Sequence, residues 1–437
     1  MSDDKGLIER VLAPIADVRR GETGGALLLM LTMFLILGGY YLLKTAREIF
    51  ILSDGGAEVK SYSSAGQALL LLFIVPAYGA FATRVNRKRL TQWVTLFFAS
   101  NLIVFLGALS LHWRIGIAYF LWVGVFNVMV IAQYWAFAND LYTQEQGKRL
   151  FPLIGIGSSL GAWVGSIRAG TLLAAAGPWR LLAGAAAILV LCAGLAGFID
   201  RLTKRSAPAE RARSEAPLAE GRSGFGMIRS DRYLMLIAVL ILLLNVVSTS
   251  GGYLFDRYVT ATATARFGTG PDTTAAREQF IGQTYGSYFA SVNLVGFLLQ
   301  MFVVSRVFKF LGVARALLIH PIVALVGYVG MLRAPSFEFI RWVKIADSSI
   351  DYSLGNTTKQ ALWLPTSREA KYKAKQAVDA FFMRAGDVLQ AGIVYSGELL
   401  SFTVTAFAAL NILFVVCWLA AVRGLSRSLR ARATPEF

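Results

Sequence analysis

Long apolar stretches of helix length alternate with short polar segments along almost the whole chain. Crossing the hydrocarbon core of a bilayer takes about 20 apolar residues in an α-helix, because that core is about 30 Å thick. The stretches do not show the two-residue alternation of a β-strand. Since backbone polar groups cannot stay unpaired in lipid, the pattern predicts an all-α polytopic membrane protein.

The apolar pattern predicts twelve transmembrane helices in two six-helix halves. We expect the first six near 25–52, 65–84, 91–111, 115–138, 152–176 and 179–199. We expect the second six near 233–256, 281–304, 310–332, 335–352, 376–400 and 403–423. The polar stretch between them predicts three parts: an N-terminal six-helix bundle at 1–199, a cytoplasmic linker at 200–232 and a C-terminal six-helix bundle at 233–437.

Composition supports the membrane class and narrows the choice of partners. The chain is 56% hydrophobic and 16% charged, whereas an ordinary soluble protein carries about 25% charged residues. A net charge of +17 would suggest nucleic acid as the partner of a soluble protein. Here the basic residues cluster between apolar stretches, which indicates cytoplasmic loops. We therefore expect a lipid bilayer and no nucleic acid as partner, with both termini cytoplasmic.

Two short motifs recur at equivalent points of the two halves. Gly38-Gly39-Tyr40 precedes Lys44, and Gly251-Gly252-Tyr253 precedes Arg257. Thr83-Arg84-Val85 likewise matches Ser305-Arg306-Val307. Duplicated transporters carry their binding site near the bilayer midplane between such repeats. The alternative is chance similarity between glycine-rich apolar helices.

Three ionisable residues lie inside the first apolar stretch. Lys44, Arg47 and Glu48 share one helical face, and apolar residues continue beyond them. An ionised side chain at the bilayer centre costs at least about 2.5–3.5 kcal/mol, so it usually faces a cavity or a partner. The stretch therefore predicts a cationic wall of a solute path, with Glu48 tempering the charge. The alternative is a helix end whose long side chains reach the membrane interface.

The tenth and eleventh predicted helices carry further charges. These are Arg341, Lys344, Asp347 and Asp351 on one face of the tenth, and Asp379, Arg384 and Asp387 on the eleventh. They predict either a structural network of interior ion pairs or a gate whose pairs exchange between conformations. Arg168 stands apart from other charges in the fifth helix and requires an anion, from another helix or from a solute. Beside it, Gly157, Gly161 and Gly165 predict close helix packing.

Sequence motifs of enzymes and pumps are missing from the chain. It has two histidines and no HExxH pair, and it lacks the GxxxxGK[ST] loop that cradles phosphates. We expect neither an enzyme nor a bound metal or cofactor.

Three groups of motifs resemble those of a known family. The first is Leu43-Lys44-Thr45-Ala46-Arg47-Glu48 followed by Gly56-Ala57-Glu58. The second is Tyr134-Trp135-Ala136-Phe137-Ala138-Asn139 followed by Lys148-Arg149-Leu150-Phe151-Pro152-Leu153. The third is Asp351-Tyr352-Ser353-Leu354, Thr358-Lys359 and Lys373-Ala374-Lys375-Gln376-Ala377-Val378-Asp379. Together, in this order, they resemble the ATP/ADP translocase (nucleotide transporter) family of plastids and intracellular bacteria.

The resemblance implies a major-facilitator-like fold of twelve helices that exchanges nucleotides across a bacterial inner membrane. The family's intramembrane lysine of helix 1 falls on Arg47, so a cation is kept there. Its other three intramembrane charges fall on Val123, Ser248 and Asp387, where this sequence departs from the family.

These observations predict a secondary carrier that works by alternating access on a nucleotide or another small anionic solute. The predicted substrate-binding residues are Lys44, Arg47, Arg341, Lys344 and Arg384. The predicted gating or ion-pair residues are Glu48, Asp347, Asp351, Asp379, Asp387 and Arg168. The alternative is a membrane scaffold or regulatory protein that does not transport.

Overall fold

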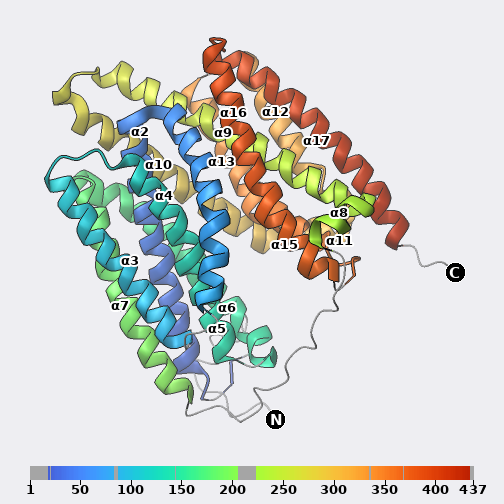
Figure 1. Cartoon of the computed structure of the whole chain (residues 1–437), viewed down its shortest axis with the longest axis horizontal. Coiled ribbons are helices and arrows are strands. Elements are labelled where there is room, and N and C mark those ends of the chain that lie inside the picture. The colour runs from blue at the N-terminus through green and yellow to red at the C-terminus, as the bar shows by residue number, and fades with distance from the viewer. Residues whose placement is uncertain are drawn as a thin grey trace. The chain divides into compact units, whose positions relative to one another are not determined.

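The computed structural model describes residues 18–19, 21–82, 87–142, 144–204, 223–333, 336–367 and 369–433. Over these residues the chain is helical and contains no strand, which confirms the predicted all-α class (Figure 1). The repeat motif at 83–85 and the linker residues 205–222 lie outside the described residues.

In the described part of its first half, the chain forms six helices and one π-helical turn. They are α2 (Thr23–Ala82), α3 (Arg87–Ser110), α4 (Gly116–Phe126), η1 (Asn127–Ile131), α5 (Ala132–Leu141), α6 (Gln144–Ala176) and α7 (Trp179–Lys204). The helix α2 contains the first two predicted spans. It changes direction at Gly56, whose φ of 73° is readily adopted by glycine and rarely by other residues.

In the described part of the second half, the helices are interrupted by π-helical turns and one 3₁₀ turn. The helices are α8 (Gly224–Ser230), α9 (Arg232–Phe267), α10 (Thr274–Leu298), α11 (Val304–Ala316), α12 (Ile319–Arg333), α13 (Phe337–Ile350), α14 (Asn356–Ala361), α15 (Lys375–Ala377), α16 (Met383–Leu399) and α17 (Val404–Ala433). The turns are the 3₁₀ turn η2 (Pro271–Thr273) and the π-helices η3 (Leu299–Val303), η4 (Asp351–Gly355), η5 (Ala370–Ala374) and η6 (Val378–Phe382).

Among the described residues, eight helical stretches are long and apolar enough to cross a bilayer. They include the 56-residue stretch at the start of α2 and a 46-residue stretch from η2 to α11. Large apolar side chains are widely exposed on their surfaces, as at Phe73, which is 76% exposed. Such a surface suits lipid rather than water. The chain is therefore an integral membrane protein, while the number of twelve spans stays a prediction.

The described helices pack into two compact units. Unit 1 comprises residues 1–54, 73–214 and 269–290, and unit 2 comprises residues 55–72, 215–268 and 291–437. Each unit thus includes a helical stretch from the other half of the sequence. The division into bundles at 1–199 and 233–437, joined by the linker 200–232, stays a prediction.

Close packing of α6 against α2 organises unit 1. A Cβ atom added to Gly161 would lie 2.1 Å from the carbonyl oxygen of Phe34, and one added to Gly165 would lie 2.5 Å from that of Gly38. Gly157 approaches the backbone of α2 in the same way. The prediction that these three glycines permit close helix contact is confirmed.

Candidate functional site

In unit 1 the interior lysine of α2 lies among aromatic rings. The Nζ atom of Lys44 is 4.4 Å from the ring centroid of Phe289, 5.1 Å from that of Tyr41 and 5.9 Å from that of Tyr40. The rings of Tyr41 and Phe289 meet edge to face at 5.7 Å. Aromatic faces attract an ammonium group when it is removed from water. They therefore hold the Lys44 charge inside the unit.

One turn further along α2, Arg47 contacts both an aromatic ring and a carboxylate. Its guanidinium carbon is 4.7 Å from the ring centroid of Phe120, and its Nε donates to Glu48 Oε1 at 3.1 Å. The Glu48 side chain is 1% exposed. The carboxylate therefore neutralises part of the cationic charge within unit 1, as the sequence suggests, whereas the roles of these residues in binding or gating stay predictions.

In unit 2, α13 places a lysine and an aspartate one turn apart. Lys344 Nζ lies 2.8 Å from Asp347 Oδ2, and His320 Nε2 on α12 lies 2.9 Å from Asp347 Oδ1. The three side chains are about nine-tenths buried, with exposed fractions of 10% for Lys344, 11% for Asp347 and 6% for His320. The Asp347 carboxylate therefore contacts both Lys344 and His320.

The helix α9 supplies backbone groups to this cluster. Lys344 Nζ donates to the carbonyl oxygen of Ser248 at 2.9 Å, and the Tyr328 hydroxyl donates to that of Val247 at 2.8 Å. A Cβ atom at Gly251 would lie 2.6 Å from the Tyr328 hydroxyl, so the bare glycine makes room for it. Ser248 stands where the family resemblance implies an acid, and in this chain it faces a lysine.

Two further predicted cations of unit 2 are paired with acids on their own helices. Arg341 lies 3.4 Å from Glu338, and Arg384 lies 3.5 Å from Asp387. Asn245 on α9 also donates a side-chain hydrogen bond to the backbone of α16 beside Arg384. Both arginines are partly buried.

The remaining predicted residues lie in different surroundings. Asp351 falls in the π-helix η4 and pairs with Lys359 of α14 at 3.0 Å. Asp379 is exposed, with Lys375 and Lys359 acting on it electrostatically. Arg168 is exposed on α6, and no side-chain ion pair is found for it among the described residues. The gating roles of all these residues stay predictions.

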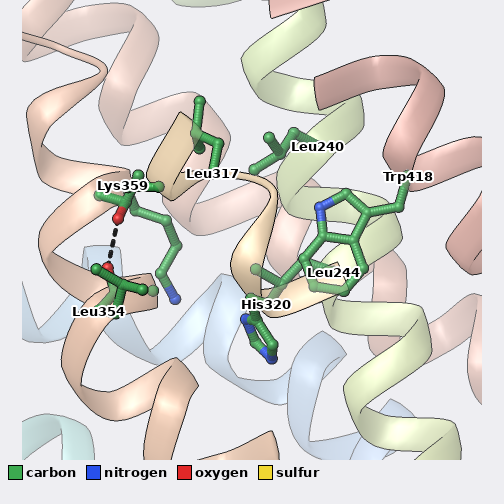
Figure 2. A pocket seen from close by; sticks show the side chains of 10 residues that line it. Leu240, Leu244, Leu317, His320, Leu354, Lys359 and Trp418 are labelled. Atoms are coloured by element: carbon green, nitrogen blue, oxygen red, sulfur yellow. Dashed lines mark hydrogen bonds between the residues drawn. The ribbon is translucent and has the colours of Figure 1, made fainter. Parts of the chain in front are cut away.

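A small pocket in unit 2 borders the Lys344–Asp347–His320 cluster (Figure 2). Apolar residues, among them four leucines, line most of it, and its polar edge consists of His320, Thr358 and Lys359. The ring of Trp418 meets that of His320 edge to face at 5.0 Å. The pocket therefore combines an apolar lining with an imidazole and an ammonium group.

Sequence reasoning missed three residues at these sites. His320 is an ionisable residue inside the ninth predicted span, and its position there was sufficient reason to predict it as a site residue. Lys359 belongs to a family-like motif, but its pairing with Asp351 depends on η4. Phe289 carries no charge or motif, so the sequence offered no signal for its place beside Lys44.

The sequence matches that of a transporter superfamily over most of its length. A family model described as Major Facilitator Superfamily matches residues 29–350. The ADP,ATP carrier protein 2 of Chlamydia pneumoniae is 21% identical over 97% of this chain and 92% of its own length. The resemblance stated from the helix motifs is thereby confirmed.

Solved transporters share the fold. A POT family transporter in complex with 5-aminolevulinic acid has a TM-score of 0.62 at 13% identity, covering 92% of this chain and 96% of its own. A bacterial homologue of the iron transporter ferroportin, in an inward-facing state, has a TM-score of 0.61 at 13% identity, covering 91% and 98%. The chain belongs to the Major Facilitator Superfamily and is an integral membrane transporter.

Proposed function

We propose that this transporter is a secondary carrier that moves a nucleotide such as ATP or ADP, or another phosphate-bearing anion, by alternating access. The observation that carries the proposal is the position of Lys44 against the rings of Tyr41 and Phe289 within unit 1. An ammonium group attracts phosphate, and aromatic rings stack on a nucleobase. Both parts of a nucleotide would therefore find matching groups on α2 and α10.

Arg47 would add a second cation to the same wall. Its guanidinium is partly buried, and Glu48 offsets one unit of charge. A bound phosphate could replace the carboxylate as partner of Arg47, since a guanidinium recognises both groups through paired hydrogen bonds. In this proposal Glu48 keeps Arg47 paired while no solute is bound.

Within unit 2, the substrate-binding residues that we propose are the cations Arg341, Lys344 and Arg384. Each has a carboxylate neighbour on its own helix. Exchange of these ion pairs between conformations is the gating role we propose for the paired acids. Asp351, Asp379 and Arg168 belong to the same gating proposal; Asp351 is paired with Lys359, whereas Asp379 and Arg168 are exposed. We further propose that both termini are cytoplasmic, in a bacterial inner membrane.

Uptake of labelled ATP and ADP into proteoliposomes tests this function. We expect wild-type protein to take up label when the vesicles are preloaded with unlabelled nucleotide, and Arg47→Ala to take up at least tenfold less. Arg19→Ala is the matched control, because the Arg19 ion pair to Glu145 is largely exposed and lies outside the predicted spans. Uptake no faster than in protein-free vesicles, for every nucleotide tried, would rule out this substrate class.

A further inference from the structure

The imidazole of His320 is held in a way that neither ion pairing nor packing alone explains. Its Nε2 atom lies 2.9 Å from Asp347 Oδ1. Its Nδ1 atom is buried and has no hydrogen-bond partner among the described residues. The residue as a whole is 5% exposed. Buried polar atoms are normally satisfied, so an unmatched ring nitrogen needs a reason.

The hydrogen bond to Asp347 determines the tautomer of the neutral His320 ring. A carboxylate oxygen accepts hydrogen bonds, so neutral His320 presents its N–H at Nε2 to Asp347. The other ring nitrogen then carries a lone pair, next to Gly355 and at the edge of the pocket in Figure 2. Such a nitrogen is a base with an open position for a proton.

The charged groups around the ring come from three helical segments. Asp347 and Lys344 lie beside it on α13. Lys359 of α14 lines the same pocket and is paired with Asp351 of η4. The helix α9 presents leucines and α17 presents Trp418 to the pocket. On α12 itself, the Tyr328 hydroxyl lies close enough to Asp347 to interact with it electrostatically.

We propose that His320 is a proton-binding site, and that its charge state sets how firmly Asp347 holds Lys344. A proton that binds Nδ1 turns the ring into an imidazolium, and the carboxylate of Asp347 then has two cations to satisfy. The cluster changes from neutral to a net charge of +1, and Lys344 loses part of its counter-charge. Within the proposed carrier function, on which this role rests, the loosened ammonium would be available to an anionic solute.

The contact between His320 and Trp418 provides a spectroscopic reporter of this proton. An imidazolium quenches the fluorescence of an indole in contact with it more strongly than a neutral imidazole does. Histidine ordinarily changes charge between about pH 5 and 8. The experiment is a fluorescence titration of purified protein from pH 5 to 9, with the Trp418→Phe titration subtracted because the chain has 9 tryptophans.

We expect the Trp418 signal to fall as the pH is lowered, and to become flat in His320→Gln. Two substitutions should move the midpoint in opposite directions. Asp347→Asn removes the carboxylate that stabilises the imidazolium, so its midpoint should lie at lower pH. Lys344→Met removes a competing cation, so its midpoint should lie at higher pH.

A purely structural histidine would give a different result. A Trp418 signal that is flat in the wild type, or that titrates equally in His320→Gln, would overturn the proton site. Midpoints of Asp347→Asn and Lys344→Met that move in the same direction would overturn the competition for Asp347. The titration needs no solute, so its failure is distinct from failure of nucleotide uptake, which bears on the proposed function alone.

Discussion

Removing the charge of Asp347 should be far more damaging than removing the charges of Asp347 and Lys344 together. The two side chains are about nine-tenths buried and 2.8 Å apart. Removing one partner of a buried ion pair leaves an uncompensated charge and costs about 3–5 kcal/mol, whereas replacing the whole pair by neutral groups is often close to neutral. Asp347→Asn keeps a side-chain oxygen that can accept a hydrogen bond from His320, so the substitution removes the negative charge and little else.

Denaturant unfolding in detergent, followed by circular dichroism, measures the free energies of unfolding at pH 8. We expect Asp347→Asn to lose about 3–5 kcal/mol, and Lys344→Met with Asp347→Asn to recover most of that loss. Glu145→Gln is the control, because its pair with Arg19 has exposed fractions of 69% and 58% and should contribute less than about 1 kcal/mol. An equal loss of unfolding free energy in the single and the double variant would show that the isolated buried charge of Lys344 is not what destabilises Asp347→Asn.

Three further results are expected. Gly161→Ala should lower the free energy of unfolding by about 1–3 kcal/mol, because its Cβ would overlap the backbone of α2. Gly155→Ala on the same helix is the control and should leave the free energy of unfolding unchanged, since no atom lies within 4 Å of its Cβ position. Burial raises the pKa of Glu22, but hydrogen bonds from Arg149 and neighbouring donors outweigh it and hold the pKa below the ordinary 4.5. The melting temperature of the wild type should therefore exceed that of Glu22→Gln by a constant amount above about pH 4.5, and the difference should disappear as the pH falls through the lowered pKa. Thermal melting of both proteins at a series of pH values measures this difference. Phe289→Leu removes a ring that we propose stacks on the nucleobase, and should raise the KM of nucleotide uptake by about five- to 150-fold, since stacking of a base on an aromatic ring contributes about 1–3 kcal/mol.

Helix class and close packing were predictable because they depend on local patterns. The apolar stretches predict helices. The four-residue spacing of Gly157, Gly161 and Gly165 places the three glycines on one face of α6, where another helix can approach closely. The pairing of Lys344 with Asp347 also follows from their spacing along one helix.

Features that depend on the path of the chain were not predictable. The π-helix η4 lies between Asp351 and Lys359 and shifts the helical register of the residues that follow it, so a regular helical projection does not find Lys359 as the partner of Asp351. The aromatic surroundings of Lys44 come partly from Phe289, far away in the sequence. The contact depends on residues 274–290 of α10 packing in unit 1, which the helical periodicity of each segment does not encode.

In the proposed carrier, the interior charges of α2 line an aqueous path. Substituted-cysteine labelling tests it in a background where the exposed Cys417 is replaced by Ser and the buried Cys192 is kept. We expect a charged, water-soluble thiol reagent to modify Lys44→Cys, and ATP to slow the reaction. The lipid-facing control, Phe73→Cys on the same helix, should not react. Reaction at position 73 with none at position 44 would contradict the account.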